Sequence, residues 1–295
     1  MRIVSLLPST TEIVFDLGLQ DQLQGVTIEC NWPKSAKSGR EIVVDTFTNP
    51  TMTPGEIDAI VKQRMAAGLD LYNLDDDALA RCNPDLILSQ DLCRVCAVAS
   101  GDVDAAVARL NCNATVLQID PQNLHQVIES INTIAVAAGV ADRGIALTES
   151  LHRRLEAVAM TVAGKKRPKV FVLEWTDPPF GAGHWVPDII TAAGGEPVLC
   201  RPGDRSVQTT WDEIAAATPD VVIVAPCGFG LDGASEQARS VSELLPTSVA
   251  VWAIDADAVM VRPGPRLVDG VEAIAHMLHG DNVNNLNKEL LRKIR

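Results

Sequence analysis

Short apolar runs alternate with longer stretches of helical periodicity along this 295-residue chain. Seven of the runs have the length and composition of strands that are buried on both faces of a sheet. Strands that alternate with helices in this way predict parallel α/β structure. The predicted strands are Arg2–Leu7, Gly25–Glu29, Leu86–Ser89, Thr115–Ile119, Lys169–Glu174, Val221–Ala225 and Val249–Ile254.

The turn after the first predicted strand carries a helix-start signal. Ser9 followed by Glu12 matches a capping box, and Gly18 suits the end of the helix. The pattern therefore predicts a helix N-terminus near Ser9–Thr11. Backbone N–H groups at such an N-terminus can bind a polar group of a ligand.

An internal repeat relates the two halves of the chain. The segment DALARCNPDLIL begins at Asp77 and DEIAAATPDVVIV begins at Asp212, an offset of 135 residues. The segments TVLQID and AVWAID, which end at Asp120 and Asp255, have the same offset. Each half contains an acid-led helix, a Pro-Asp turn, a strand, a further helix and a strand that ends in aspartate. Two matches at one offset predict two similar lobes.

The segment between the repeats has helical periodicity and no strand signal. Apolar residues from Ile145 to Val162 recur at helical spacing, which predicts one long backbone helix between the lobes rather than a flexible linker. We therefore expect two parallel-sheet α/β lobes with a ligand cleft between them. The expected divisions are an N-terminal lobe over 1–120, a helical connector over 121–167, a C-terminal lobe over 168–280 and a basic tail over 281–295. The tail is expected to be disordered, with a short docking helix as the alternative.

Composition acts mainly by excluding functions. A net charge of −13 argues against general nucleic-acid binding, because like charges repel. Seven cysteines, an odd number, argue against a disulfide framework. The N-terminus lacks the features of a signal peptide, so the sequence as written predicts a cytoplasmic protein, or a periplasmic one if it is a mature form. No motif of a hydrolase, kinase, metalloprotease or dinucleotide-binding enzyme is present, so we expect a protein without catalytic activity.

Candidate ligand contacts follow the carboxyl ends of the predicted strands, where ligands bind in parallel α/β folds. Aromatic residues make up only 4% of the chain, yet several fall in these loops, and such rigid walls suit a large planar ligand. Arg262 and Arg266 offer guanidinium groups to carboxylates or phosphates, with pairing to Asp255 or Asp257 as the alternative. The candidate contacts are Ser9, Thr10, Cys30, Trp32, Gln90, Asp91, Trp175, Phe180, His184, Trp185, Arg262 and Arg266.

Four cysteines follow the same strand ends: Cys30, Cys93, Cys96 and Cys227. With His184 among these loops, they could bind zinc or an iron–sulfur cluster, or contact the metal of a bound chelate. Buried thiols without a metal are the simplest alternative, since only one CxxC is present. Likewise, His184 is either a ligand or metal contact, or a structural hydrogen-bonding group.

The order and spacing of these segments resemble the cobalamin/iron-chelate class of ABC-transporter substrate-binding proteins. RIVSLLPSTTEIVFDLGL is similar to the first strand and helix of that class. LDDDALARCNPDLIL and TTWDEIAAATPDVVIV resemble its acid–helix–Pro-Asp–strand element, and DPPFGAGHWVPDIITAAGG its second-lobe ligand loop. VRPGPRLVDGVEAIAHMLH resembles its last loop and C-terminal helix. The resemblance covers about residues 2–280.

The resemblance implies a monomeric, non-enzymatic protein that binds cobalamin or a related metal chelate and needs no cofactor of its own. It also implies an acidic residue on each lobe that pairs with arginines of the importer's membrane subunits. The matching positions are Asp77 and Asp212, where the family typically has glutamate, and Asp75, Asp76 or Glu213 are the alternatives. The alternative is a cytoplasmic metal or iron–sulfur protein that uses the cleft cysteines on the same fold.

Overall fold

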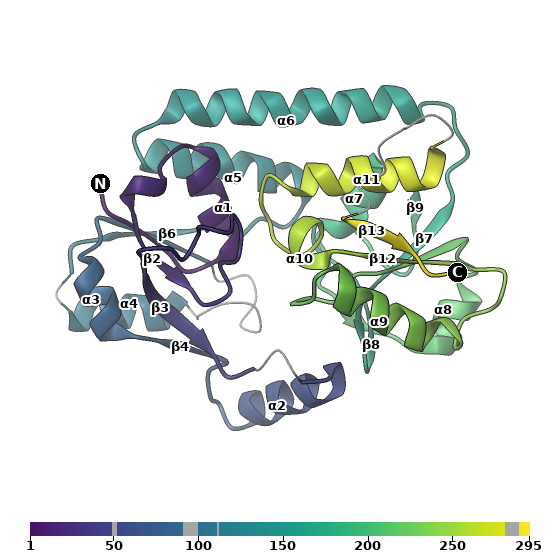
Figure 1. Cartoon of the computed structure of the whole chain (residues 1–295), viewed down its shortest axis with the longest axis horizontal. Coiled ribbons are helices and arrows are strands. Elements are labelled where there is room, and N and C mark those ends of the chain that lie inside the picture. Colours follow the sequence, from purple (N-terminus) through teal and green to yellow (C-terminus); the bar gives the residue numbers. More distant parts are fainter. Residues whose placement is uncertain (49–51, 91–99, 111, 281–288) are drawn as a thin grey trace. The chain divides into compact units, whose positions relative to one another are not determined.

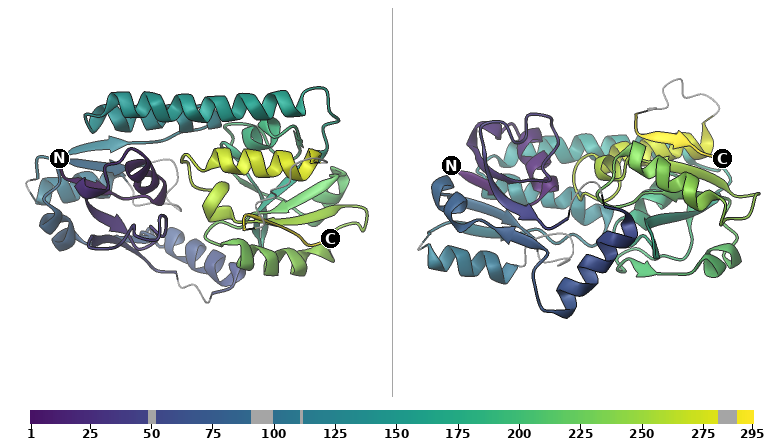
Figure 2. Two further views of the ribbon diagram at one scale, coloured as in Figure 1. Left: turned by 45° about the horizontal axis from the view of Figure 1, so that its top comes forward. Right: turned by 60° about the horizontal axis from the view of Figure 1, so that its bottom comes forward.

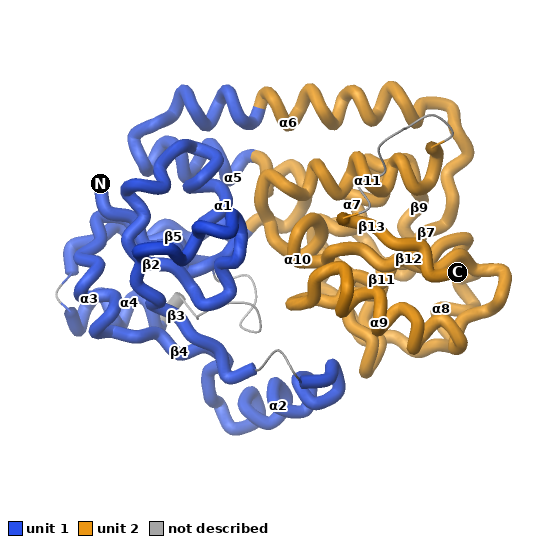
Figure 3. Tube along the Cα trace, in the orientation of Figure 1, with its two compact units in different colours: residues 1–120, 129–148 blue, residues 121–128, 149–295 orange. Residues whose placement is uncertain are grey.

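The computed structural model describes residues 1–48, 52–90, 100–110, 112–280 and 289–295, and it forms two compact units (Figures 1 and 3). Unit 1 contains residues 1–120 and 129–148, and unit 2 contains residues 121–128 and 149–295. Each unit has its own mostly parallel sheet covered by helices, which confirms the predicted fold class. The ligand cleft expected between the lobes stays a prediction.

The expected connector contains two helices rather than one. They are α5 (Leu124–Ala137) and α6 (Ala141–Val162), and the long helix predicted from apolar spacing is α6. Both helices are shared between the units, since the first turns of α5 belong to unit 2 and the first turns of α6 belong to unit 1. No helix in the described ranges is both long and apolar enough to cross a membrane.

The sheet of unit 1 has the strand order β4-β3-β2-β1-β5-β6, and every neighbouring pair is parallel except β3 with β4. The four strands predicted in this half are confirmed as β1, β2, β5 and β6. The strands of unit 1 are β1 (Ile3–Ser5), β2 (Leu23–Thr27), β3 (Glu41–Thr46), β4 (Tyr72–Leu74), β5 (Leu86–Ser89) and β6 (Thr115–Gln118). Its other helices are α1 (Pro8–Asp16), η1 (Gln20–Gln22), α2 (Pro54–Ala66), α3 (Asp76–Cys82) and α4 (Ser100–Arg109).

The sheet of unit 2 has the order β10-β8-β7-β11-β12-β13, with β9 also paired to β7. Helix α9 covers one face of this sheet, and α7 and α11 cover the other (Figures 1 and 2). The strands are β7 (Lys169–Thr176), β8 (Pro179–Gly181), β9 (Glu196–Pro197), β10 (Val207–Gln208), β11 (Val221–Val224), β12 (Ala250–Ile254) and β13 (Leu291–Lys293). The helices are α7 (Val186–Ala192), α8 (Trp211–Ala216), α9 (Leu231–Ser242), α10 (Ala256–Val259) and α11 (Leu267–His279).

The repeat seen in the sequence is a structural repeat. Helices α3 and α8 begin 135 residues apart, and so do strands β5 and β11 and strands β6 and β12. In each unit the first parallel strand of the repeat, β1 or β7, lies beside the strand that follows the acid-led helix. The two units therefore present their strand-end loops in the same order along the chain.

Helix α1 begins earlier than predicted, and the expected capping box of Ser9 and Glu12 is wrong. The helix starts at Pro8 with Leu7 as its N-cap residue, and no side chain caps it. Proline suits the first position because its fixed φ is already helical and the N–H that it lacks would have no partner there. Ser9 and Glu12 consequently lie inside the helix, and both are buried.

The segment 289–295 extends the sheet of unit 2 instead of forming the docking helix that the sequence analysis considered. Strand β13 pairs antiparallel with β12, and Leu291 is buried. Arg295 holds this end, since its guanidinium donates hydrogen bonds to the carbonyl oxygens of Ser242 (2.6 Å) and Pro246 (2.8 Å). Residues 281–288 lie outside the described residues.

Arg154 ties α6 to α11 within unit 2. Its guanidinium donates two hydrogen bonds to Glu272 (2.6 and 2.8 Å) and one to Asp269, and the bonds to Glu272 contribute most to raising the pKa of Arg154. We expect Arg154→Met to lower the free energy of unfolding by about 1 kcal/mol, and by less at high salt, because the group is partly exposed and its charge is screened. Urea denaturation followed by tryptophan fluorescence measures this effect.

Arg153→Met is the matched control for this prediction. The side chain of Arg153 is 67% exposed and lies 3.9 Å from Glu149, so its loss should change stability by less than about 0.5 kcal/mol. Equal effects of the two replacements at every salt concentration would contradict a stabilising role for the Arg154 ion pairs.

Candidate functional site

The carboxyl ends of β7, β11 and β12 come together in unit 2. The backbone N–H of Cys227, after β11, donates to the carbonyl oxygen of Glu174 in β7 (3.2 Å). The next N–H, of Gly228, donates to a carboxylate oxygen of Asp257 (3.0 Å). Asp257 lies in α10, the short helix after β12, two residues beyond its N-cap residue Asp255. These bonds join the loop after β11 to β7 and to the segment that follows β12. The edge expected to carry the site is therefore an ordered surface in this unit.

Aromatic side chains gather on the same loops. The rings of Trp175 and Phe229 lie 6.1 Å apart between centroids and are tilted by 57°. Phe180, on the short strand β8, is the cross-strand partner of Trp175. All three side chains are partly exposed. The structure thus brings together two predicted contacts, Trp175 and Phe180, and adds Phe229 from the loop after β11.

Arg262 pairs with Asp257 in its own loop, which is one of the two roles considered for it from the sequence. Its guanidinium donates to Asp257 (2.9 Å), and its side chain is 11% exposed. Burial raises the pKa of the nearby Asp255 carboxyl, and the charge of Asp257 raises it further. The charges of Arg266 and Arg262 act in the opposite direction. The loop after β12 therefore holds two carboxyls and two guanidinium groups in one electrostatic cluster.

His184 lies between β8 and α7 with a left-handed backbone, φ +52°. Its backbone N–H donates to Asp204 (2.6 Å), while its side-chain Nε2 is buried without a hydrogen-bond partner. Burial lowers the pKa of His184, and the charge of Arg205 lowers it further. The imidazole is consequently neutral at neutral pH, which is the form that can bind a metal.

Trp185 is a buried residue, and its environment favours a packing role over the predicted ligand contact. The side chain is 6% exposed, and the indole N–H donates to the carbonyl oxygen of Met260 (2.8 Å). A buried indole of this kind usually satisfies its one polar atom by such a bond. The residue therefore fixes α7 to the segment after α10.

In unit 1 the predicted contacts Ser9, Thr10 and Cys30 are buried beneath the strand ends. The hydroxyl of Thr10 lies 2.7 Å from that of Ser5, and the sulfur of Cys30 lies 3.1 Å from the hydroxyl of Thr11. Such contacts satisfy the buried hydroxyl and thiol groups of these residues. They favour a structural role for Thr10 and Cys30, and Ser9 is buried beside them in α1.

The remaining predicted contacts of unit 1 differ in exposure. Trp32 is 45% exposed, whereas Gln90, directly after β5, is buried. Asp91 lies outside the described residues. Of the predicted contacts that the structure describes in unit 1, Trp32 is therefore the one with a side chain exposed enough to contact a ligand.

The predicted cysteine cluster has little support. Cys30 lies among buried hydroxyl groups, Cys227 is exposed, and Cys93 and Cys96 lie outside the described residues. Within the ranges that the structure describes, the group of side chains that could hold a metal contains no cysteine.

The two acidic residues predicted to dock on a partner occupy equivalent positions. Asp77 is the second residue of α3 and Asp212 is the second residue of α8, and both side chains are exposed. Their helices begin in the same way, because the side chains of Asp75 and Thr210 each accept the N-cap hydrogen bond. The repeat therefore places one exposed carboxylate at the start of one helix in each unit.

The chain belongs to the periplasmic binding protein family, whose model matches residues 3–249. It is 26% identical to the substrate-binding lipoprotein YvrC of a Bacillus subtilis ABC transporter, over 95% of this chain and 80% of that protein. It is 20% identical to a vitamin B12-binding protein of Vibrio cholerae, over 94% and 88% of the two chains.

Solved structures share the fold. A periplasmic heme-binding protein of Pseudomonas aeruginosa matches with a TM-score of 0.74 at 18% identity, covering 100% of this chain and 98% of that one. The vitamin B12-binding protein of Vibrio cholerae matches with a TM-score of 0.66 at 20% identity, covering 94% and 96%. The chain is thus an ABC-transporter substrate-binding protein of the B12, heme and iron-chelate type, and no catalytic family is indicated.

The comparisons also bear on two other expectations, and they correct one of them. A cytoplasmic location is contradicted, because relatives of this family are periplasmic proteins or lipoproteins of ABC importers, which points to a location outside the cytoplasm. They give no support for zinc or an iron–sulfur cluster at the cysteines, since relatives bind B12 or heme as transported ligands.

Sequence reasoning missed Asp257 and Glu174 as parts of the site. Asp257 was considered only as a partner for an arginine, yet it also accepts the hydrogen bond that fixes the loop after β11. Glu174 accepts a hydrogen bond from the hydroxyl of Ser206 (2.8 Å), which in turn accepts from the N–H of Gly183 beside His184. A signal was present in Glu174, the charged residue that ends the predicted strand Lys169–Glu174 at its carboxyl end.

Protonation of His184 should make the fold less stable in mildly acidic solution. Because the folded-state pKa is lowered below 6.5, the unfolded chain takes up a proton first as the pH falls from 7 to 5. The free energy of unfolding therefore decreases over this range through His184. We expect His184→Asn, which tolerates the left-handed backbone, to show a smaller decrease in urea denaturation at pH 7, 6 and 5.

Arg205→Gln tests the second cause of the lowered His184 pKa, the positive charge of Arg205. Without that charge the pKa of His184 should rise part of the way toward its usual value, so the decrease in stability should be intermediate. Identical pH dependence in the wild-type chain and His184→Asn would exclude His184 as its source.

Proposed function

We propose that this protein captures cobalamin, or a closely related metal chelate, and delivers it to an ABC importer in the membrane. The observation that carries the proposal is the aromatic group of Trp175, Phe180 and Phe229 at the strand ends of unit 2. A corrin or porphyrin ring offers a large flat apolar surface. Rigid aromatic side chains bury such a surface with little loss of conformational entropy.

Polar groups beside the aromatic side chains can provide specificity. Asp257 and Arg262 are held in fixed positions by their mutual ion pair, and Arg266 lies on the same loop. Amide or phosphate groups on the edge of a chelate can bind such preorganised partners through hydrogen bonds. Neutral His184 offers a nitrogen that could reach the metal if its ring rotates out of the buried position.

Delivery requires contacts with the importer. The resemblance to this class assigns that contact to one acidic residue per lobe, and Asp77 and Asp212 are exposed at the matching positions. Neighbouring acids have other roles, since Asp76 pairs with Arg109 (2.7 Å) and Glu213 forms the capping box with Thr210. We therefore assign docking to Asp77 and Asp212.

Ligand titration tests the proposal directly. Cyanocobalamin, heme and a ferric siderophore are each titrated into the purified protein, with calorimetry and visible spectra as readouts. We expect one equivalent of cobalamin to bind with the highest affinity. Tighter binding of heme or of the siderophore would contradict cobalamin as the ligand. If none of the three compounds bound, the proposal that the ligand is a metal chelate would be contradicted.

Trp175→Ala should weaken cobalamin binding about 10- to 100-fold, because loss of a large aromatic contact costs about 1.4–2.8 kcal/mol of binding free energy. Trp175→Phe keeps a flat apolar wall and should recover most of the affinity. Calorimetric titration of both variants makes the comparison. Affinities of Trp175→Ala within twofold of the wild-type value would remove Trp175 from the site.

A further inference from the structure

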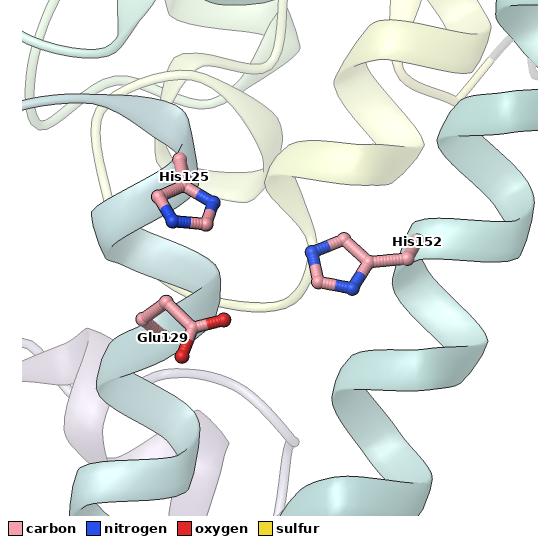
Figure 4. A group of neighbouring side chains, drawn as sticks. All are labelled: His125, Glu129 and His152. Carbon is pink, nitrogen blue, oxygen red and sulfur yellow. The ribbon is translucent and has the colours of Figure 1, made fainter.

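Two histidines and a glutamate come together on α5 and α6 (Figure 4). His125 and Glu129 are four residues apart on α5, so their side chains project from one face of the helix. His152 points toward them from α6. One ligand atom from each of the three side chains lies within 4.8 Å of the other two. Three residue types that ligate metals therefore converge on one point.

Other interactions of these side chains do not explain why they converge. In the part of the chain that the structure describes, none of the three makes a side-chain hydrogen bond or ion pair. His125 and Glu129 are exposed and His152 is half-buried, so hydrophobic packing does not account for their positions. Exposed side chains can also rotate at low cost to meet an ion.

The geometry suits a small ion with nitrogen and oxygen ligands. Tetrahedral zinc with bonds of about 2.0–2.1 Å places its ligand atoms about 3.3 Å apart. Rotation of the side chains about their χ angles can shorten the present separation. His125 and His152 belong to the same unit, and the helix fixes Glu129 one turn from His125. The convergence is therefore a property of the α5–α6 pair.

We propose that His125, Glu129 and His152 bind a divalent transition-metal ion of the zinc type. Two imidazoles favour such ions over Ca²⁺ and Mg²⁺, which prefer sites made of oxygen ligands. Three protein ligands leave a fourth position for water. The bound ion would clip α5 to α6. This site does not depend on the proposed ligand, and it involves none of the cysteines considered above.

Imidazole NMR spectra during titration with zinc chloride test the site. The chelator-treated protein has five histidines, and we expect the signals of His125 and His152 to shift up to one equivalent of Zn²⁺. Calorimetry of the same titration should show that His152→Ala and Glu129→Gln each bind one Zn²⁺ ion fewer than the wild-type protein, or bind it at least about tenfold more weakly. Loss of an outer-shell partner alone costs about 10–100-fold in affinity, so loss of a ligand should cost no less.

Glu149→Gln is the matched control, since it removes a carboxylate from α6 that pairs with Arg153 instead. It should bind zinc as the wild-type protein does. Zinc held by thiols would leave both imidazole signals in place. Unshifted signals of His125 and His152 at one equivalent, or unchanged zinc binding by both His152→Ala and Glu129→Gln, would overturn the proposal. Glu129 is exposed, so its replacement keeps the test valid if His152→Ala folds poorly.

Discussion

Replacing both Asp77 and Asp212 with arginine should reduce importer-dependent uptake at least tenfold while ligand binding stays unchanged. Both carboxylates are exposed at the second position of a helix, one in each unit. In the proposed complex each faces arginines of the membrane subunits. Like charges placed opposite one another across an interface cost several kcal/mol, which corresponds to more than a hundredfold in affinity.

Uptake of labelled cobalamin into cells or vesicles that carry the importer measures this effect, and calorimetry checks that the ligand still binds. The charge-matched control is Asp104→Arg with Glu236→Arg, which changes exposed acids on α4 and α9 by the same total charge. This control should transport at the wild-type rate. Wild-type uptake by the Asp77→Arg, Asp212→Arg variant would show that these residues do not dock, whichever ligand the protein carries.

Phe171→Ala should destabilise unit 2 by about 3–5 kcal/mol, because it leaves a large cavity in the centre of the core. Phe171 lies on β7 and is 1% exposed. It belongs to the cluster in which Leu173, Val222, Val251 and Ala238 pack between the sheet and α9. Urea denaturation followed by tryptophan fluorescence suits this test, since four of the five tryptophans, Trp175, Trp185, Trp211 and Trp252, are in unit 2.

Phe47→Ala provides a control with the same chemical change. Phe47 is 45% exposed, and the guanidinium of Arg64 lies 3.6 Å from its ring centroid. Its loss should cost less than about 1 kcal/mol, the usual value of an exposed cation–π contact. Comparable destabilisation by both replacements would mean that burial of Phe171 contributes much less than its position indicates.

The central strands could be predicted because burial on both faces leaves a continuous apolar run. Leu86–Ser89, in the interior of its sheet and buried throughout, was located in this way. Thr115–Gln118 lies at the edge of the sheet with exposed or half-buried side chains, and its apolar residues and its repeat in the second half predicted it. The other edge strands, β4, β10 and β13, were missed because they are short and partly exposed. β10 (Val207–Gln208), for example, has two residues, both exposed, and carries no apolar signal.

The loops of the site could be predicted from the chain order, but the partners within them could not. Parallel topology determines that the residues after β7, β11 and β12 share an edge. Whether Arg262 meets a ligand or Asp257 depends on loop conformation, which residue spacing does not determine. His125 and Glu129 share a helix face that spacing reveals, whereas the approach of His152 requires the packing of α5 against α6.

The division of α5 and α6 between the units limits how the protein can be dissected. A recombinant fragment that stops at Asp120 would lack residues 129–148, which belong to unit 1 and include Arg143, whose guanidinium donates to the carbonyl oxygen of Leu17 (2.9 Å). A fragment that continues to Thr148 restores those residues but removes 121–128 from unit 2, where the N–H of Leu124 donates to Asp188 (3.0 Å). No single cleavage point yields both halves intact, so each unit must be studied within the whole chain.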